Sequence, residues 1–533
     1  MTTIKVVTTG IGATTESGSI PGTTDSGSIP GTTDSGSIPG TTDSGSIPGT
    51  TDSGSIPGTT DSGSIPGTTD SGSIPGTTIM SGTIDSGVPA GTAPVFNTTL
   101  GLVSAPPIDN LRFAKPQPAT QWNGTFNAVA YGPACPQHKN PFLDESLNED
   151  CLSLNVFVPQ VSNSDPLPIM VHIPGGRFTF YGSEVEPGEN LAATGKVIVV
   201  SLNYRVGVFG FLNTNDDCAR GNWGLWDQHL AIKWVKDNAE RFGGDPNQIT
   251  IFGKSSGANS VLYQALSPLN SNEDFKRVIA QSPIHFNYRS NDPYSGADLT
   301  RTLAKNLGYD NVKDSKGMLQ YLRNQSVSDL LAEYANLPIS FYPVMDDEFL
   351  RGTDLFDSDV DISQYDLLIG YNSGDMSASY GNRQPALNKQ EFFDYIDTRL
   401  EGLCRDYDEC QNKALAVQAS AFAYNNIQDL NTNETLNIAR AMEIALDTSF
   451  SSFVSFLARD HQARGGNTYA YEFTYADTEF WPVQAPPNIL PRPGHVEDVY
   501  YVFGTDAISK GNADQRALSY AFMQYWTNFA ING

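Results

Sequence analysis

Residues Ile249-Thr250-Ile251-Phe252-Gly253-Lys254-Ser255-Ser256-Gly257-Ala258 decide the fold class, because they carry Gly-x-Ser-x-Gly between two different patterns. An apolar, β-rich run precedes the motif and a helix-like run follows it. Glycines on both sides of a serine permit the tight strand-to-helix turn that projects its hydroxyl. A helix N-terminus behind the serine favours developing negative charge. The stretch therefore predicts a nucleophilic serine, Ser255, at the end of a buried strand.

Short apolar runs and amphipathic runs alternate around this turn from about residue 93 onward. The predicted strands are residues 169–173, 197–202, 249–252, 278–281 and 367–370, and the main predicted helices are residues 225–242, 436–460 and 517–529. Buried strands separated by helices are typical of an α/β fold with a mostly parallel central sheet flanked by helices. Ligands of such sheets bind at the carboxyl ends of the strands, where Ser255 is predicted to lie.

A serine hydroxyl is a weak nucleophile until a base takes its proton, and the chain has six histidines. Five have contexts that suit a base less well: His172 is in a predicted strand, His229 and His461 are on helical patterns, His138 is between two cysteines, and His285 follows residues 281–283. His495 lies on a late loop rich in proline and glycine. The sequence therefore predicts His495 as the base.

The acid that orients this base is predicted to be Asp375, which follows the predicted strand 367–370 and a short turn. The order Ser255, Asp375, His495 is the order in which a sheet of this kind supplies a nucleophile, an acid and a base. Each residue alone has a simpler reading, as a capping serine, a turn aspartate or a surface histidine. Three in this order favour a catalytic triad.

The loop after the predicted strand 169–173 contains Gly175 and Gly176. Backbone N–H groups there and at Ser256 would bind the negative charge that develops on a carbonyl oxygen under attack. The alternative is a plain Pro-Gly-Gly turn.

The composition of this 533-residue chain narrows the classes of partner that it could bind. A formal net charge of -27 and a pI near 4.4 repel nucleic acid and anionic lipid surfaces. No apolar run reaches the roughly 18 residues that a membrane span needs. No clustered His, Cys and carboxylate spacing fits a metal site, so we expect neither a metal nor a cofactor. The expected partner is a small molecule, and the oligomeric state stays open.

A nine-residue unit, Gly-Ser-Ile-Pro-Gly-Thr-Thr-Asp-Ser, recurs from residue 18 to residue 72. With one isoleucine and no aromatic residue per unit it cannot bury enough surface to offset its ordering entropy. We therefore divide the chain into an opening strand region (1–16), a disordered low-complexity tract (17–92) and a catalytic domain (93–533). The tract is either an adhesive or O-glycosylated stalk or an insertion produced by repeat slippage.

Cysteines and sequons bear on the compartment. Cys135 and Cys151 would close a short loop and Cys404 and Cys410 a tighter one, which leaves Cys218 over. Four Asn-x-Ser/Thr sequons, at Asn97, Asn123, Asn324 and Asn433, would suit a secreted glycoprotein, although such tripeptides also arise by chance. No secretory signal is readable at the start, so secretion is suspected and the cytoplasm stays open.

Four further stretches closely resemble the type-B carboxylesterase and cholinesterase family. They are residues 148–156 (Asn-Glu-Asp-Cys-Leu-Ser-Leu-Asn-Val), 201–207 (Ser-Leu-Asn-Tyr-Arg-Val-Gly), 221–228 (Gly-Asn-Trp-Gly-Leu-Trp-Asp-Gln) and 242–246 (Phe-Gly-Gly-Asp-Pro). The resemblance implies the α/β-hydrolase fold and hydrolysis of carboxylic esters. The family's loop-closing disulfide maps onto Cys135 and Cys151, and Ser282 maps onto a serine that supports the triad. Residues 1–12 look like the family's opening strand, which would make the repeat an insertion.

Departures from the family pattern qualify this expectation. Arg177 replaces the third glycine of the oxyanion loop and is expected to put bulk where the acyl group sits. Lys254 replaces the usual glutamate before the nucleophile and is expected to invert the local field. The triad acid is Asp375 instead of glutamate, and residues 135–151 lack the tryptophan with which cholinesterases bind a quaternary ammonium. The family pattern also continues beyond residue 533, which predicts a fragment or a shortened member.

Two functions follow as hypotheses. The first is a serine carboxylesterase in which Ser255 attacks an ester, His495 moves the proton, Asp375 holds the imidazole, and water releases the acid. The second is a catalytically impaired relative with a storage, adhesion or scaffold role, suggested by Arg177, Lys254 and the repeat.

Overall fold

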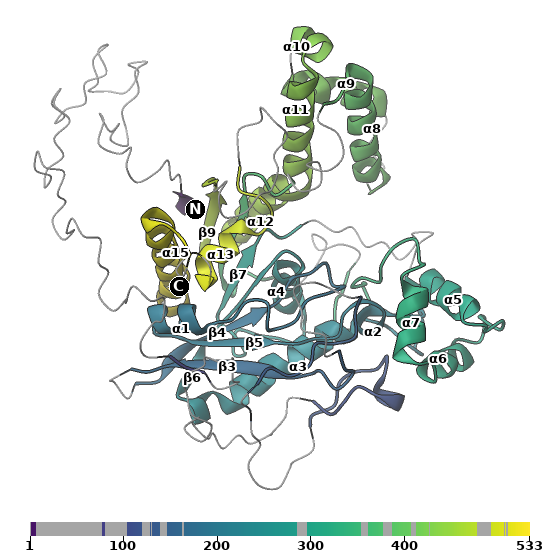
Figure 1. Cartoon of the computed structure of the whole chain (residues 1–533), viewed down its shortest axis with the longest axis vertical. Helices are drawn as coiled ribbons and strands as arrows, with labels where there is room; N and C mark the ends of the chain where they lie inside the picture. Colours follow the sequence, from purple (N-terminus) through teal and green to yellow (C-terminus); the bar gives the residue numbers. More distant parts are fainter. Residues whose placement is uncertain are drawn as a thin grey trace, which may run out of the picture.

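A nine-stranded sheet forms the centre of the protein, in the strand order β1-β9-β8-β7-β6-β4-β5-β3-β2 (Figure 1). The computed structural model describes residues 2–6, 77–79, 104–119, 128, 130–138, 147–161, 165–284, 296–352, 361–376, 386–406, 412–425, 427–476, 492–505, 507 and 510–533. The strands are β1 (Thr2–Val6), β2 (Thr77–Ile79), β3 (Leu154–Pro159), β4 (Leu167–Ile173), β5 (Ile198–Leu202), β6 (Gly244–Lys254), β7 (Arg277–Gln281), β8 (Asp366–Asn372) and β9 (Thr468–Phe473).

Strands β4 to β9 are parallel to one another, and β1 adds to β9 in parallel. At the other end of the sheet, β3 pairs antiparallel with β5, and β2 pairs antiparallel with β3. All five residues of β5 are buried, because helices cover both faces of the sheet. Such strands need apolar side chains on both sides, which explains their continuous apolar runs. The five predicted strands and the mostly parallel α/β sheet are confirmed. The sequence analysis missed β3 and β9.

Two layers of helices enclose the sheet. On one face α1 (Glu189–Gly195), α13 (Glu497–Phe503) and α15 (Ala513–Asn532) pack together (Figure 1). The other face carries α3 (Trp223–Asn238) and α4 (Ser256–Leu266), and beside them lie α2 (Gly207–Phe211), α5 (Gly296–Asn306), α6 (Ser315–Arg323) and α7 (Val327–Tyr334). Each layer has its own buried apolar cluster, so the sheet is the shared wall of two cores.

A helical lobe stands apart from the sheet and has a small core of its own (Figure 1). It comprises α8 (Lys389–Asp406), α9 (Lys413–Tyr424), α10 (Ile427–Thr432) and α11 (Glu434–Leu446). The predicted helix over residues 436–460 is confirmed as one continuous helical stretch, but it contains a π-helical turn, Asp447–Ser451, between α11 and α12 (Ser452–Ala463). The Thr448 hydroxyl donates to the carbonyl oxygen of Ile444 at 2.7 Å, a local bond of the kind that bends helices.

The N-terminal region is described only at two strands. Strand β1 lies where an opening strand is predicted. Strand β2 falls inside the predicted low-complexity tract, where it pairs with β3 as an edge strand. The rest of the tract lies outside the described residues, and the domain boundaries stay a prediction. Within the described ranges no helix is long and apolar enough to span a bilayer.

Candidate active site

Ser255 occupies the sharp turn between β6 and α4. Its backbone has φ 54° and ψ −126°, a conformation that residues other than glycine rarely adopt. A Cβ at Gly257 would lie 2.2 Å from the carbonyl oxygen of Ile173, and one at Gly253 would lie 2.6 Å from the backbone of Gly257. The two glycines of the motif are therefore required because β6, the start of α4 and the end of β4 touch here backbone to backbone.

The three residues predicted as a triad lie together. Ser255 Oγ is 2.9 Å from His495 Nε2, and His495 Nδ1 is 2.8 Å from Asp375 Oδ1. These contacts fit the tautomer in which Nδ1–H donates to the carboxylate and Nε2 accepts from the serine hydroxyl. The Asp375 side chain is fully buried, whereas that of His495 is 29% exposed. The acid is thus shielded from water while the base keeps an open side.

Two donors fix the Asp375 carboxylate from behind. The Ser282 hydroxyl contacts both oxygens, at 3.1 and 2.9 Å, and the Asn372 backbone N–H donates to Oδ2 at 2.8 Å. Ser282 follows β7 and Asn372 ends β8, so neighbouring strands deliver both groups to the same edge. The sequence analysis identified Ser282 through the family resemblance and did not identify Asn372.

The predicted oxyanion loop lies against the nucleophile. A Cβ at Gly175 would come within 2.7 Å of the Lys254 carbonyl oxygen and 3.4 Å of Ser255 Cβ. Gly176 has φ +98°, a conformation that favours glycine. Ser256 is the first residue of α4, and its hydroxyl accepts a hydrogen bond from the Phe178 N–H at 3.2 Å, which ties the loop to the helix. Gly175 therefore lies beside the Ser255 side chain, and Gly176 follows it in the same loop.

Arg177, which replaces a glycine of the family pattern, keeps a left-handed backbone with φ 57°. Its side chain is exposed. Burial raises the pKa of Tyr334, at the end of α7, to about 12, and the positive charge of Arg177 acts in the opposite direction. The charge of Arg177 therefore acts on Tyr334 from an exposed position.

Lys254, directly before the nucleophile, forms a buried ion pair with Glu186. The two side chains are 8% and 7% exposed. Lys254 Nζ also lies 5.5 Å from the centre of the Tyr181 ring. The expectation that Lys254 inverts the field behind Ser255 did not include this partner, whose negative charge opposes that of the ammonium.

Phe450 contributes to the site, and the sequence analysis missed it. Its ring centre is 5.3 Å from that of His495, and it belongs to the π-helical turn between α11 and α12. A π turn shifts side chains out of the helical period, so periodicity could not have placed this ring.

The predicted Cys135–Cys151 disulfide is present. The Gln137 side chain, inside the loop, accepts from the Tyr181 N–H at 2.8 Å and donates to the Tyr181 carbonyl oxygen at 3.1 Å. The cystine loop is thereby fastened to the segment that follows the oxyanion loop. The side chains of Cys404 and Cys410 lie outside the described part, and Cys218 is free and exposed.

The other histidines have structural surroundings where they are described. His172 in β4 is buried between Phe252 and Phe503, and its pKa is lowered well below the usual range by burial and by the charge of Lys254. His461 bonds to Thr468 and to backbone oxygens. His285 lies outside the described residues. In the part of the chain that the structure describes, no group of three His, Cys, Asp or Glu side chains could hold a metal ion.

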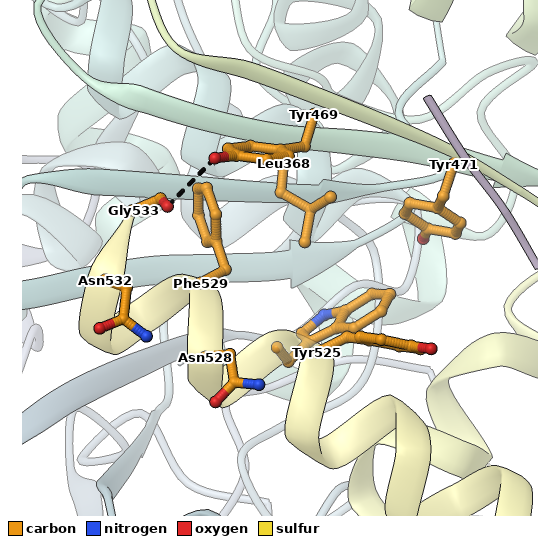
Figure 2. Close-up of a pocket in the computed structure, with 9 residues that line it drawn as sticks. Leu368, Tyr469, Tyr471, Tyr525, Asn528, Phe529, Asn532 and Gly533 are labelled. Carbon is orange, nitrogen blue, oxygen red and sulfur yellow. Dashed lines mark hydrogen bonds between the residues drawn. The ribbon is translucent and has the colours of Figure 1, made fainter. Parts of the chain in front are cut away.

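A separate apolar cavity of about 280 Å³ lies between α15 and strands β8 and β9 (Figure 2). It is lined by Leu368, Tyr469, Tyr471, Tyr525, Trp526, Asn528, Phe529, Asn532 and Gly533. None of the three predicted triad residues lines it. This cavity is therefore distinct from the site around Ser255.

Known proteins similar to this chain agree with the fold. A sequence model of the carboxylesterase family matches residues 104–533. Carboxylesterase 1C of Mus musculus is 30% identical over 464 residues, which cover 80% of this chain and 79% of that protein. Bile salt-activated lipase of Bos taurus is 33% identical over 458 residues, covering 79% and 72%, and carboxylesterase 5A of Canis lupus familiaris is 32% identical over 477 residues, covering 83% and 78%. The chain belongs to the carboxylesterase family of α/β hydrolases.

Proposed function

We propose that this protein is a serine carboxylesterase that acts through an acyl-enzyme. The observation that carries the proposal is the pair of contacts on the His495 ring, 2.9 Å to Ser255 Oγ and 2.8 Å to Asp375 Oδ1. A base in hydrogen-bond contact with a hydroxyl, itself oriented by a carboxylate, activates that hydroxyl as a nucleophile. The relatives named as carboxylesterases and as a lipase support ester hydrolysis in general.

In the proposed acylation step, Ser255 Oγ attacks the ester carbonyl while His495 Nε2 takes the hydroxyl proton. The carbonyl oxygen becomes an oxyanion, for which the N–H groups of Gly175, Gly176 and Ser256 are the proposed donors. His495 then protonates the leaving alcohol, and the ester C–O bond breaks. Asp375 stabilises the transient imidazolium.

In the proposed deacylation step, water attacks the acyl-enzyme and gives its proton to His495. The carboxylic acid leaves and Ser255 regains its proton. The substrate that fits this proposal is a small ester without a quaternary ammonium, because residues 135–151 contain no tryptophan.

The compartment is a further part of the proposal. The Cys135–Cys151 disulfide suits an oxidising environment, and the two sequon asparagines in described segments, Asn324 and Asn433, are both exposed. We therefore propose a secreted or secretory-lumen glycoprotein. Mass spectrometry of the protein from its native source, before and after glycosidase treatment, tests this.

The test of the reaction is hydrolysis of p-nitrophenyl acetate, butyrate and octanoate by the full chain, compared with Ser255→Ala. We expect a loss of at least about 1,000-fold in kcat for Ser255→Ala. A fluorophosphonate probe should label the parent at Ser255 and leave the variant unlabelled. Hydrolysis that survives in Ser255→Ala contradicts the proposal.

Arg177→Gly distinguishes the impaired-relative hypothesis. An inactive parent together with an active Arg177→Gly variant would show an oxyanion loop disabled by Arg177 and would favour the storage or scaffold role. Activity in the parent that changes by less than about threefold in Arg177→Gly would show that the exposed side chain leaves the loop functional.

A further inference from the structure

Asp498, the second residue of α13, is a completely buried carboxyl group outside the triad. It accepts three hydrogen bonds: from Gln281 Nε2 at 2.9 Å, from the Tyr471 hydroxyl at 2.6 Å and from Asn372 Nδ2 at 3.2 Å. None of these donors is a cation. Burial raises the pKa of Asp498, and the nearby Asp375 charge acts in the same direction. A buried carboxyl group without a counter-ion is costly, so its presence calls for an explanation beyond packing.

One of its donors, Asn372, connects Asp498 to both the acid and the base. Asn372 Nδ2 also donates to the carbonyl oxygen of Gly494, the residue before His495, at 2.7 Å. The Asn372 backbone N–H donates to Asp375 Oδ2. Two acceptors on one amide nitrogen define how the amide is turned. By holding Asn372, Asp498 therefore helps to hold the loop that carries His495 against the loop that carries Asp375.

A second donor, Gln281, connects Asp498 to the nucleophile. The Gln281 carbonyl oxygen accepts from the Ser255 N–H at 2.8 Å. Its side-chain oxygen accepts from Trp526 Nε1 at 3.2 Å, while its side-chain nitrogen donates to Asp498. Gln281 is thus fixed at both ends of its amide, and its backbone is bonded to the strained turn at Ser255.

The third donor, Tyr471, crosses from β9 to reach Asp498 because β8 has a glycine beside it. Gly370 pairs with Tyr471 in the sheet, and a Cβ at Gly370 would lie 2.2 Å from the Tyr471 ring. Glycine inside a strand weakens it and often marks a close approach of another group. Tyr471 also lines the cavity under α15 (Figure 2). The strand therefore leaves open the space in which the phenol lies.

We propose that Asp498 is a positioning residue for the reaction, acting through Asn372 and Gln281 on the relative placement of Ser255, Asp375 and His495. This inference rests on the proposed esterase function. A displacement of about 1 Å in such a site can cost about 100-fold in rate. A purely structural Asp498 would affect stability and leave turnover of the folded protein unchanged.

The experiment compares Asp498→Asn, Tyr471→Phe and Tyr365→Phe in the full chain. Asparagine keeps the shape but replaces one acceptor by a donor, so it cannot accept from Gln281, Tyr471 and Asn372 together. Tyr471→Phe removes one donor and keeps the ring. Tyr365→Phe is the matched control, because the Tyr365 hydroxyl is equally buried and no described group bonds to it.

We measure kcat and KM for p-nitrophenyl butyrate, with active sites counted by the fluorophosphonate probe. We expect kcat per labelled site to fall at least about tenfold in Asp498→Asn and at least about threefold in Tyr471→Phe, with KM within about twofold. Tyr365→Phe should keep kcat within about twofold. If Asp498→Asn does not fold, Tyr471→Phe decides the question.

Unchanged kcat per labelled site in Tyr471→Phe, or in a folded Asp498→Asn, overturns the positioning role while leaving the esterase proposal intact. An equal loss in Tyr365→Phe overturns it as well, because any buried hydroxyl would then have the same effect. Failure of the esterase proposal has a different signature: the parent enzyme is then not labelled at Ser255, or its hydrolysis survives in Ser255→Ala.

Discussion

Lys254 and Glu186 form a buried ion pair directly behind the nucleophile, although 68 residues separate them in the chain. Lys254 ends β6, and Glu186 lies in the connection between β4 and α1. The pair joins the base of the nucleophile turn to a neighbouring loop. Neither charge has ready access to water, so each depends on the other.

Removing one member of this pair should destabilise the protein strongly. We expect Glu186→Gln or Lys254→Met to lower the free energy of unfolding by about 3–5 kcal/mol, because the remaining charge is buried without its partner. The swapped double variant Lys254→Glu/Glu186→Lys should lose less than either single variant. Urea unfolding measures this, with Asp298→Asn at the exposed Arg301 pair as a control that should change by less than about 1 kcal/mol. A double variant that loses as much free energy of unfolding as the two single variants together would contradict the pairing.

The turn at Ser255 should tolerate no side chain at its second glycine. Gly257→Ala would place a Cβ 2.2 Å from the Ile173 carbonyl oxygen, a backbone atom that cannot move aside cheaply. We expect at least about 3 kcal/mol of destabilisation and loss of Ser255 labelling. Gly243→Ala is the matched control: it has φ +83° and no neighbour within 4 Å, so it should cost only about 1–2 kcal/mol. Thermal unfolding and probe labelling measure both variants. Equal losses in Gly257→Ala and Gly243→Ala would contradict the explanation.

The Cys135–Cys151 disulfide should stabilise the fold. It links residues 16 apart, for which the loop-closure entropy predicts about 3 kcal/mol. The double variant Cys135→Ser/Cys151→Ser should therefore melt at a lower temperature, and its KM should rise as Gln137 loosens from Tyr181. Differential scanning calorimetry gives the first quantity and ester kinetics the second. Cys218→Ser serves as the control, since that thiol is free and exposed; an unchanged melting temperature in the double variant would contradict the prediction.

Acid should destabilise the protein partly through His172. Because burial lowers the pKa of His172 in the folded state, the unfolded chain binds a proton more readily. The neutral, buried ring of His172 contributes fully to the free energy of unfolding above pH 6.5, the ordinary histidine pKa. This contribution is lost as the pH falls below 6.5. His172→Phe should therefore lose less stability than the parent on acidification, by up to about 1.4 kcal/mol per pH unit. Parallel curves of unfolding free energy against pH would show that His172 does not contribute.

Much of the fold and of the candidate site could be predicted because the information is local. Short runs of adjacent residues are enough to predict the turn at Ser255 and the buried strands around it. Strand β9 was missed because Thr468–Phe473 alternates aromatic residues with threonine, alanine and glutamate instead of forming a plain apolar run. Its Tyr471 bonds to Asp498, and the missing side chain at Gly370, far away in the chain, makes room for that ring.

Partnerships across the chain could not be predicted in the same way. Lys254 signals a departure from the family pattern, but nothing near it in sequence points to Glu186. The ring of Phe450 contacts that of His495 from within a π turn, which breaks the ordinary helical period. Such contacts depend on how distant elements pack, which local patterns in a single sequence do not predict.

The distances along the chain between the three proposed catalytic residues bear on biosynthesis. Asp375 and His495 are 120 residues apart, and Ser255 and His495 are 240 apart. A ribosome that emits roughly 5–20 residues per second therefore exposes the nucleophile many seconds before its base exists. Throughout that interval the nascent protein carries a serine without its base, so the proposed esterase activity can arise only after His495 has emerged.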